Sequence, residues 1–159
     1  MLEPHLGRRP ARHARLGFTL VELMIVVGLL SVLSAIAVPN FLDMRFRSQR
    51  SEMPTNVAAI QLAERAYFQE FDTYTSVGLQ PRADGALDSQ SADWQVTFVD
   101  WNALGFQPTQ KVRGNYVVTS TQTSFTVTGR CDLDDDDVLA TFVGETDTEP
   151  RMVSPNSEF

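Results

Sequence analysis

A single carboxylate, Glu22, lies near the start of an apolar run that carries no charge from Leu23 to Leu42. An ionisable side chain at the centre of a bilayer costs roughly 2.5–3.5 kcal/mol, so such a residue usually has a function. A small residue, Gly17, precedes this run and follows an arginine-rich segment. The pattern makes Glu22 a candidate functional residue and predicts a cationic or hydrogen-bonding partner for its carboxylate. A plain signal anchor with an incidental Glu is the less favoured interpretation, because the small residue and the carboxylate occur together.

Residues 17–22 (GFTLVE) resemble the N-terminal processing site of type IV prepilins and of the related pseudopilins of type II secretion. Pro39, which ends the apolar run, matches the same signature, and the resemblance extends to about Phe71. It implies that a prepilin peptidase cleaves between Gly17 and Phe18 and that the new Phe18 amine is methylated. It also implies that Glu22 acts in assembly, by pairing with the Phe18 amine of a neighbouring subunit.

The charge of the chain is unevenly distributed. The 159 residues carry a net charge of −7, and the predicted leader, residues 1–17, holds four arginines against one glutamate, so the remainder carries −10. Phosphate binding needs clustered Lys and Arg, so nucleic acid is not expected as the primary partner. The length fits one domain plus a helical extension.

The order of the N-terminal segments predicts the topology. In an ordinary secretory signal the apolar segment precedes the cleavage site, whereas here it follows Gly17 and stays in the mature protein. The arginines before the run favour a cytoplasmic N-terminus. We therefore expect a single-pass inner-membrane protein that contacts the lipid bilayer. After assembly it would lie in an extracellular pilus, or in a periplasmic pseudopilus if the chain is a pseudopilin.

Two helical segments are expected before the head. Residues 18–39 form the transmembrane and assembly helix, because the 21 residues from Phe18 to Val38 span about 31 Å as a helix and a hydrocarbon core measures about 30 Å. Pro39 should kink or locally melt this helix. Residues 40–71 form its second half, with a bend or break near Pro54. Apolar residues recur in this half at helical spacing, which predicts packing against a sheet: Val57, Ile60, Ala63 or Glu64, Tyr67 and Phe71.

Residues 72–159 should form the globular head. Residues 72–93 are expected to be a connecting loop and residues 100–113 an ordered loop. Segments rich in β-branched and aromatic residues predict strands at 94–99, 115–121, 124–128 and 138–143, with a hairpin between the second and third. The predicted fold class is α+β and pilin-like, with a long N-terminal helix packed on a small antiparallel sheet.

The acidic run at 132–137 is the candidate metal site. Asp132, Asp134 and Asp136 alternate as at the start of calcium loops. The sixth position of such a loop needs Gly and the twelfth Glu, but the chain has Asp137 and Val143, so the EF-hand interpretation fails. The favoured interpretation is a solvated acidic turn without metal or cofactor, and a looser calcium site is the alternative.

Cys131 is the one cysteine of the chain, so no intramolecular disulfide can form, unlike in many pilins. We expect its thiol to be partly buried and unreactive, since the nearby Asp132 and Asp134 disfavour a thiolate.

No enzymatic activity is expected. Both histidines, His5 and His13, lie in the leader, and no nucleophile has a recognisable base. The predicted function is a structural subunit of a type IV pilus, joined by an inner-membrane assembly platform to copies of itself and other pilins. The fibre would serve adhesion, motility or DNA uptake, and the subunit could be major or minor. A type II secretion pseudopilin is the alternative. A membrane-anchored binding module is a third reading, disfavoured because an anchor does not need Glu22.

Overall fold

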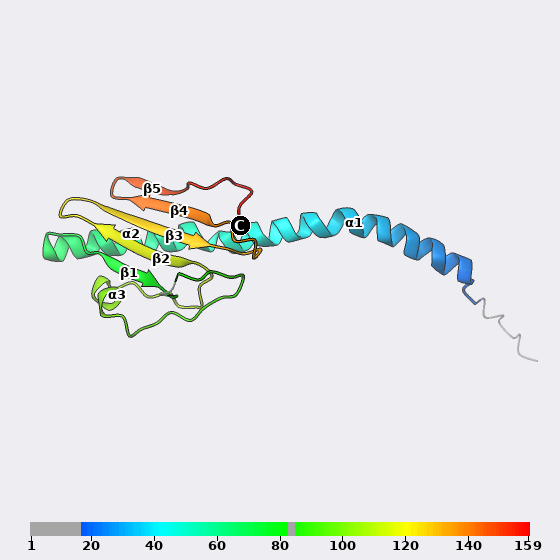
Figure 1. The fold of residues 1–159 in the computed structure, drawn as a ribbon, viewed down its shortest axis with the longest axis horizontal. Helices are drawn as coiled ribbons and strands as arrows, with labels where there is room; N and C mark the ends of the chain where they lie inside the picture. The colour runs from blue at the N-terminus through cyan, green and yellow to red at the C-terminus, as the bar shows by residue number, and fades with distance from the viewer. Residues whose placement is uncertain (1–16, 83–84) are drawn as a thin grey trace, which may run out of the picture. The chain divides into compact units, whose positions relative to one another are not determined.

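The computed structural model describes residues 17–82 and 85–159. The predicted leader lies outside the described residues except for Gly17. The chain divides into two units, Met1–Asn40 and Phe41–Phe159. Figure 1 shows the helix of the first unit and the helix, sheet and loops of the second.

The first helix, α1 (Leu20–Arg50), begins in the first unit and ends in the second. Its sequence up to Leu42 is almost wholly apolar, and leucine and methionine are good helix formers. Pro39 lies inside the helix. The prediction of local melting at Pro39 is therefore wrong: one missing N–H removes one hydrogen bond, and the turns on either side keep theirs. A kink at this residue stays a prediction.

The second helix, α2 (Glu52–Phe71), follows α1 after a single intervening residue, Ser51. The sequence predicted a break near Pro54, and the boundary lies three residues earlier. Pro54 occupies the first turn of α2, where its missing N–H would have no intrahelical partner in any case. The series of helical backbone hydrogen bonds is interrupted one turn before the proline, because Pro54 has no N–H to donate to the carbonyl of Arg50. Ser51 itself keeps helical dihedral angles, φ −62° and ψ −15°.

Five antiparallel strands form one sheet in the order β1-β2-β3-β4-β5. They span Val77–Gln80, Asn115–Ser120, Phe125–Cys131, Ala140–Glu145 and Thr148–Met152. Each strand pairs with the next one in the chain, so the sheet is a meander. The predicted hairpin at 115–128 is confirmed by the β2–β3 register, in which Val117 lies opposite Thr128 and Ser120 opposite Phe125. The α+β prediction of a long N-terminal helix with a small antiparallel sheet is confirmed.

The structure corrects several element predictions in the head. Residues 94–99 are not a strand, and Val99 begins a short helix, α3 (Val99–Leu104), inside the predicted loop 100–113. The aromatic side chain that suggested a strand, Trp94, packs edge-on against Trp101 instead, with ring centroids 4.9 Å apart. β1 lies in the predicted loop 72–93, and β5 was not predicted at all because its Pro150 argues against a strand except at a sheet edge. β4 begins at Ala140 and not at residue 138, because the preceding turn continues through Asp137, whose φ is 63°.

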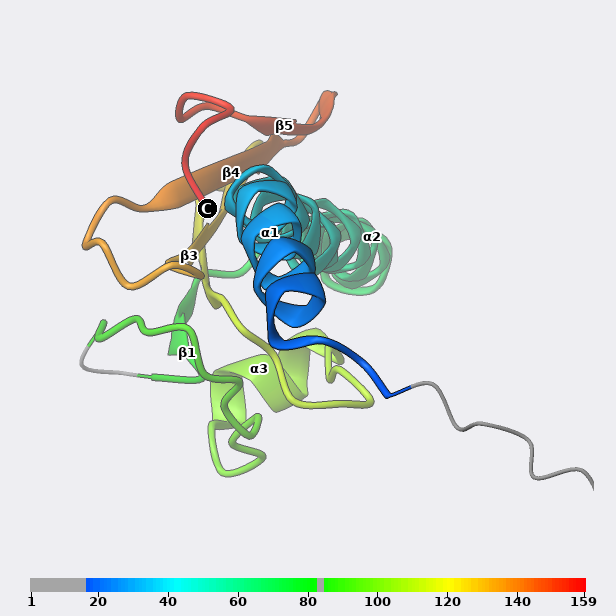
Figure 2. The same ribbon diagram turned by 90° about the vertical axis from the view of Figure 1, so that its right-hand side faces the viewer.

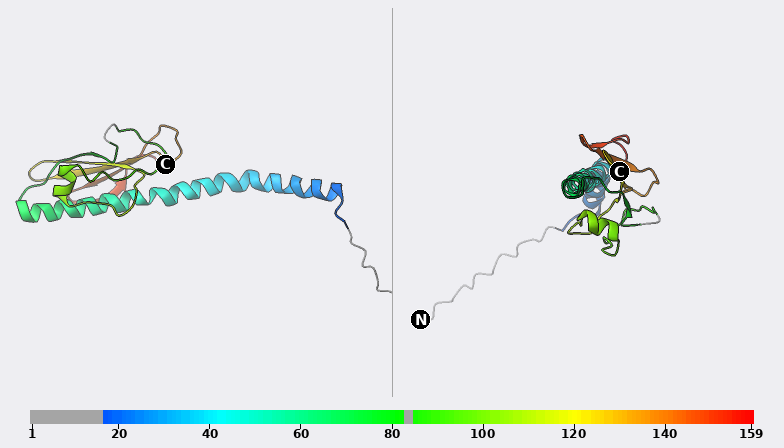
Figure 3. Two further views of the ribbon diagram at one scale, coloured as in Figure 1. Left: turned by 90° about the horizontal axis from the view of Figure 1, so that it is seen from below. Right: turned by 90° about the vertical axis from the view of Figure 1, so that its left-hand side faces the viewer.

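Helix α2 packs on one face of the sheet, as Figures 2 and 3 show. Val57 and Ile60 are fully buried, as the stripe predicted, whereas Phe71 at the end of the stripe is 53% exposed. The sequence did not decide whether Ala63 or Glu64 belongs to the buried stripe. In the structure Glu64 is fully buried and Ala63 partly buried. A Cβ on Gly144 of β4 would lie 2.7 Å from the Gln61 side chain, so this glycine lets the helix approach closely.

Candidate processing and assembly site

The predicted cleavage site lies just before α1. Residues 17–19 are not helical, and Thr19 caps the helix, because the backbone N–H of Glu22 donates to the Thr19 hydroxyl at 3.1 Å. The pattern Thr-x-x-Glu before an apolar run is the sequence signature of a capping box, and it could have identified Thr19 from the sequence. The helix therefore begins at Leu20, and the Gly17–Phe18 peptide bond lies in the non-helical backbone before it.

Gly17 is not required by crowding within the described part of the chain. A Cβ at Gly17 would have no heavy atom within 4 Å, apart from its chain neighbours. The side chain of Phe18 is 75% exposed. The fold of the described residues therefore imposes no requirement for a small residue at position 17.

Glu22 lies in the first turn of α1 and is exposed. The backbone N–H groups of a first helical turn carry a partial positive charge, which favours a carboxylate there. Among the salt bridges of the described residues none involves Glu22. The described part of the chain thus gives this carboxylate the helix terminus but no cationic side chain within salt-bridge distance.

The rest of this helical segment is apolar on every side. Every residue from 18 to 38 is exposed, including Leu29, Val32 and Ile36, which are 63%, 64% and 66% exposed. Within the described residues, the Leu20–Phe71 helical stretch holds the one segment long and apolar enough to cross a membrane. A helix that is apolar all round needs lipid or other protein around it. The Ser31 hydroxyl donates to the Val27 carbonyl at 2.7 Å, so it brings no unpaired donor into such surroundings.

Small side chains form a shallow apolar depression on this segment. It lies around Gly28, where a Cβ would meet no atom within 4 Å, and it is lined by Leu20, Leu23, Met24, Val27 and Ser31. Small residues allow the backbones of packed helices to approach closely. This face of α1 is therefore suited to close helix contacts.

The acidic run forms a tight turn between β3 and β4. Asp132 is 2% exposed, and its carboxylate accepts hydrogen bonds from the N–H groups of Asp135 at 2.8 Å and Asp137 at 3.1 Å. Carboxylate oxygens of Asp132, Asp134 and Asp136 lie within 4.8 Å of one another. Burial, and next the charge of Asp136, raise the pKa of Asp134. The turn has the oxygen ligands that calcium prefers, but its own amides already satisfy the buried Asp132.

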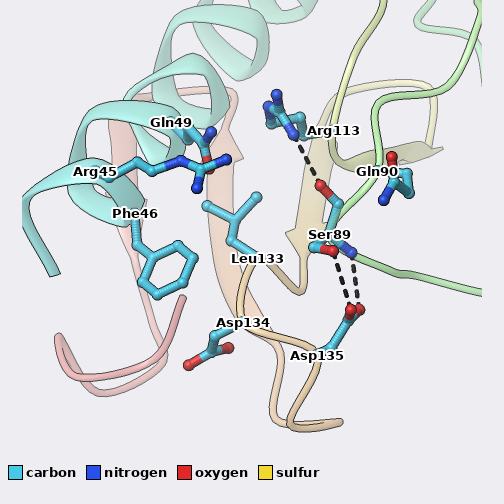
Figure 4. A pocket seen from close by; sticks show the side chains of 9 residues that line it. All are labelled: Arg45, Phe46, Gln49, Ser89, Gln90, Arg113, Leu133, Asp134 and Asp135. Atoms are coloured by element: carbon cyan, nitrogen blue, oxygen red, sulfur yellow. Dashed lines mark hydrogen bonds between the residues drawn. The ribbon is translucent and has the colours of Figure 1, made fainter. Parts of the chain in front are cut away.

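A groove of about 370 Å³ runs beside this turn (Figure 4). Asp135 uses both carboxylate oxygens on Ser89, accepting from its N–H at 2.9 Å and its hydroxyl at 3.0 Å, and Arg113 donates to the Ser89 carbonyl at 2.8 Å. The polar groups on this side of the groove therefore hold the loop around Ser89. Phe46 and Leu133 supply its apolar lining.

Cys131 is free and fully buried, whereas the sequence led us to expect only partial burial. Burial, as the largest cause, raises its pKa to about 12, and the nearby Asp132 and Asp134 act in the same direction. A thiol with such a pKa remains protonated at neutral pH and is a poor nucleophile.

Arg50 is a structural residue that the sequence did not reveal. Its side chain is 8% exposed and reaches residues more than a hundred positions later in the chain. The guanidinium donates to the carbonyls of Asn156 and Glu158 and to the Asn156 side chain. Phe159 in turn accepts a backbone hydrogen bond from Leu133 at 2.8 Å. No local pattern signals a contact of this kind, because it joins segments that are distant in sequence.

The similarity to known proteins is strongest in the N-terminal segment of the chain. Residues 12–38 match a family model described as the prokaryotic N-terminal methylation motif. The chain is 49% identical over 59 residues to the type IV major pilin protein PilA of Myxococcus xanthus, covering 37% of this chain and 27% of that protein.

Two further relatives differ in type. The fimbrial protein EcpC of Eikenella corrodens is 34% identical over 108 residues, which cover 68% of this chain and 63% of the relative. The type II secretion system core protein G of Klebsiella michiganensis is 30% identical over 71 residues, 43% of this chain and 50% of the relative. The chain spans less than two thirds of the length of each of these three relatives. The methylation motif, the relatives and the helix-and-sheet fold agree, and the chain belongs to the type IV pilin and pseudopilin family.

Proposed function

We propose that this chain is a structural subunit of a type IV pilus. A prepilin peptidase cleaves it between Gly17 and Phe18, the Phe18 amine is methylated, and α1 then packs with other copies in a helical fibre for adhesion, motility or DNA uptake. Relatives described as major pilin and fimbrial proteins support this assignment. The proposal includes no enzymatic role and no cofactor, and a calcium ion at the acidic turn stays a separate prediction.

The observation that carries the proposal is the combination of a wholly exposed apolar segment with one unpaired carboxylate in its first turn. A simple membrane anchor needs the apolar surface but gains nothing from a carboxylate that is costly in lipid. A subunit that leaves the membrane for a fibre needs both features, because the apolar surface then packs on other subunits and the carboxylate can recognise one of them.

Glu22 lies four residues after Phe18, in the first turn of α1. After cleavage, the methylated Phe18 amine of a neighbouring subunit can supply the counter-charge that the described residues do not. Such a pair would neutralise both charges in apolar surroundings and would set the axial register of each added subunit.

The membrane orientation follows from the arginines of the leader, residues 1–16 of which lie outside the described part. We place the N-terminus in the cytoplasm and the head outside the inner membrane before assembly. The partners of the proposal are the peptidase, the inner-membrane assembly platform, the lipid bilayer, and copies of this chain and other pilins.

Surface fibres provide the test. Cells that express the full chain with a small epitope tag should yield sheared fibres that a tag antibody labels along their length in electron microscopy. The same fibres, analysed by intact mass, should contain a subunit that begins at a methylated Phe18. Absence of the chain from every sheared fibre, with processed protein retained in the cell, would contradict a role as a surface pilus subunit.

A pseudopilin of a type II secretion system is the second candidate, favoured by the similarity to core protein G. It would be processed in the same way but would remain in the periplasm. Deletion of the gene separates the two functions: loss of surface fibres with normal protein secretion supports the pilus, whereas loss of secretion with normal fibres supports the pseudopilus.

A further inference from the structure

A buried carboxylate lies in the head at the contact between α2 and the loop that follows it. Glu64 is fully buried. One carboxylate oxygen accepts a hydrogen bond from the Thr75 N–H at 3.1 Å, and the other has no hydrogen-bond partner. A buried carboxylate with a single neutral donor is poorly stabilised in its charged form, whereas the protonated form is far less costly to bury.

Among the described residues, no cationic side chain pairs with this carboxylate. Ionisable side chains lie on α2 itself and on the elements packed against it, namely Glu52, Arg65, Tyr67, Glu70, Asp72, Tyr74, Asp100, Arg130, Cys131, Glu145, Glu149 and Arg151. Glu145 and Arg151 pair with each other, and Arg65 donates to the Thr146 carbonyl. None of these groups shifts the pKa of Glu64, which burial raises to about 7 and which the Thr75 N–H lowers only in part.

The loop that Glu64 holds, residues 72–76, joins α2 to the edge strand β1. It leaves the helix at Asp72, whose φ of 54° is left-handed, and it reaches the sheet through a hydrogen bond between the Ser76 and Ser120 hydroxyls. Between these points, the Tyr74 ring stacks on Phe68 of α2 and contacts Phe125 of β3. The loop therefore covers the end of the core. Beyond the helix cap, its backbone is held to α2 by the hydrogen bond from the Thr75 N–H to the Glu64 carboxylate.

We propose that Glu64 is a proton-controlled latch for the loop 72–76: protonated, it lets the loop close over the core, and ionised, it favours an open loop in which water reaches the carboxylate. The opening exposes the Thr75 amide and loosens the packing of Tyr74. This device belongs to the head and does not depend on fibre assembly.

The sign of the pH effect follows from the two states. The pKa of Glu64 is raised on folding, so between its ordinary value of 4.5 and about 7 the folded chain binds more protons than the unfolded chain. Stability therefore falls as pH rises through this window and stays low above it. The shift corresponds to a loss of roughly three hundredfold in the folding equilibrium constant.

The first test compares unfolding of the full chain in detergent micelles between pH 4.5 and 8.5. Wild type should unfold at lower denaturant concentration as pH rises, and Glu64→Gln, which cannot ionise, should lose that part of the trend. Glu70→Gln removes the same charge from an exposed site on the same helix and should follow wild type. Identical pH profiles for wild type and Glu64→Gln would overturn the proposal.

The second test asks whether the loop itself responds. Amide hydrogen exchange of residues 72–76 is compared in wild type and Glu64→Gln at the same pH, so that the intrinsic rates cancel. At pH 8 these amides should exchange several times faster in wild type, and at pH 5 the two proteins should agree. Faster exchange spread evenly over the sheet would contradict a latch. If Glu64→Gln does not fold, carbon NMR of the Glu64 carboxyl in wild type decides, since a pKa near 4.5 would end the proposal.

Discussion

The guanidinium of Arg50 lies over the ring of Phe159, 5.0 Å from its centre, and the same ring packs on Phe46 at 5.5 Å. Residues at the end of α1 and near residue 159 are thus joined without a covalent bond. The single cysteine of the sequence leaves no disulfide to do this, and Arg50 combines three hydrogen-bond acceptors with an aromatic face in one buried side chain.

Removing this contact should destabilise the head. Arg50→Ala deletes charged hydrogen bonds and leaves the Asn156 and Glu158 carbonyls without their donor, so we expect a loss of about 2–3 kcal/mol in the free energy of unfolding. Arg50→Lys should also destabilise, because an ammonium cannot reproduce the planar fork of donors. Denaturant unfolding of the full chain in micelles measures both losses. Arg47→Ala, at an exposed site on the same helix, is the matched control, and an Arg50→Ala variant as stable as this control would contradict the prediction.

Gly17 gives a prediction that separates processing from folding. Because a Cβ at this position meets nothing in the described structure, Gly17→Ala and Gly17→Val should both leave insertion and folding intact. Gly17→Val should block cleavage, since a branched side chain does not fit a subsite built for hydrogen or methyl, whereas Gly17→Ala should be cleaved at least in part. Intact mass of membrane-extracted protein distinguishes the precursor from a chain beginning at Phe18. Wild-type processing of Gly17→Val would show that the subsite is not selective.

The acidic turn can be tested for both of its interpretations. Asp132→Ala should cost about 1–3 kcal/mol, because two backbone N–H groups lose their acceptor in a buried site. Asp134→Ala removes an exposed carboxylate of the same turn and should cost little. If the turn is structural, wild type unfolds at the same denaturant concentration in calcium and in chelator. A rise in stability with calcium that Asp134→Ala abolishes would instead support the calcium alternative.

The parts of the fold that the sequence predicted are those fixed by local patterns. Each of three features is visible within a short window of the sequence: the unbroken apolar run of α1, the helical stripe through Val57 and Ile60, and the β2–β3 hairpin. β1 and β5 have weak local patterns, and their strand conformation depends on pairing with β2 and β4 at the two edges of the sheet.

The same distinction holds for the site and for single residues. Gly17, Phe18 and Glu22 form a contiguous motif, and Thr19 could have been added from its capping pattern. Arg50 has no such signal, since its partners lie over a hundred residues away. Glu64 shows the limit of a periodicity argument: its position on the buried stripe was visible, but the lack of a counter-charge around it depends on the whole packed head.

Glu22 provides the sharpest test of assembly. Its side chain is exposed in the first turn of α1 and forms no salt bridge within the described residues. Glu22→Val makes the segment more apolar and should leave insertion unchanged or favour it. Cleavage should also continue, because the Gly17–Phe18 bond is unaltered and the Thr19 cap acts through the backbone N–H of residue 22, which valine keeps.

If assembly proceeds as we propose, the variant loses the counter-charge for the methylated Phe18 amine of a neighbouring subunit. An unpaired ammonium group would then have to enter the apolar fibre interior, which is strongly unfavourable. We therefore expect Glu22→Val to accumulate as processed membrane protein with few or no fibres in electron microscopy. Glu22→Asp, which keeps the charge on a shorter side chain, should retain part of the assembly. Fibres of wild-type number and length from Glu22→Val would show that the carboxylate has no part in subunit recognition.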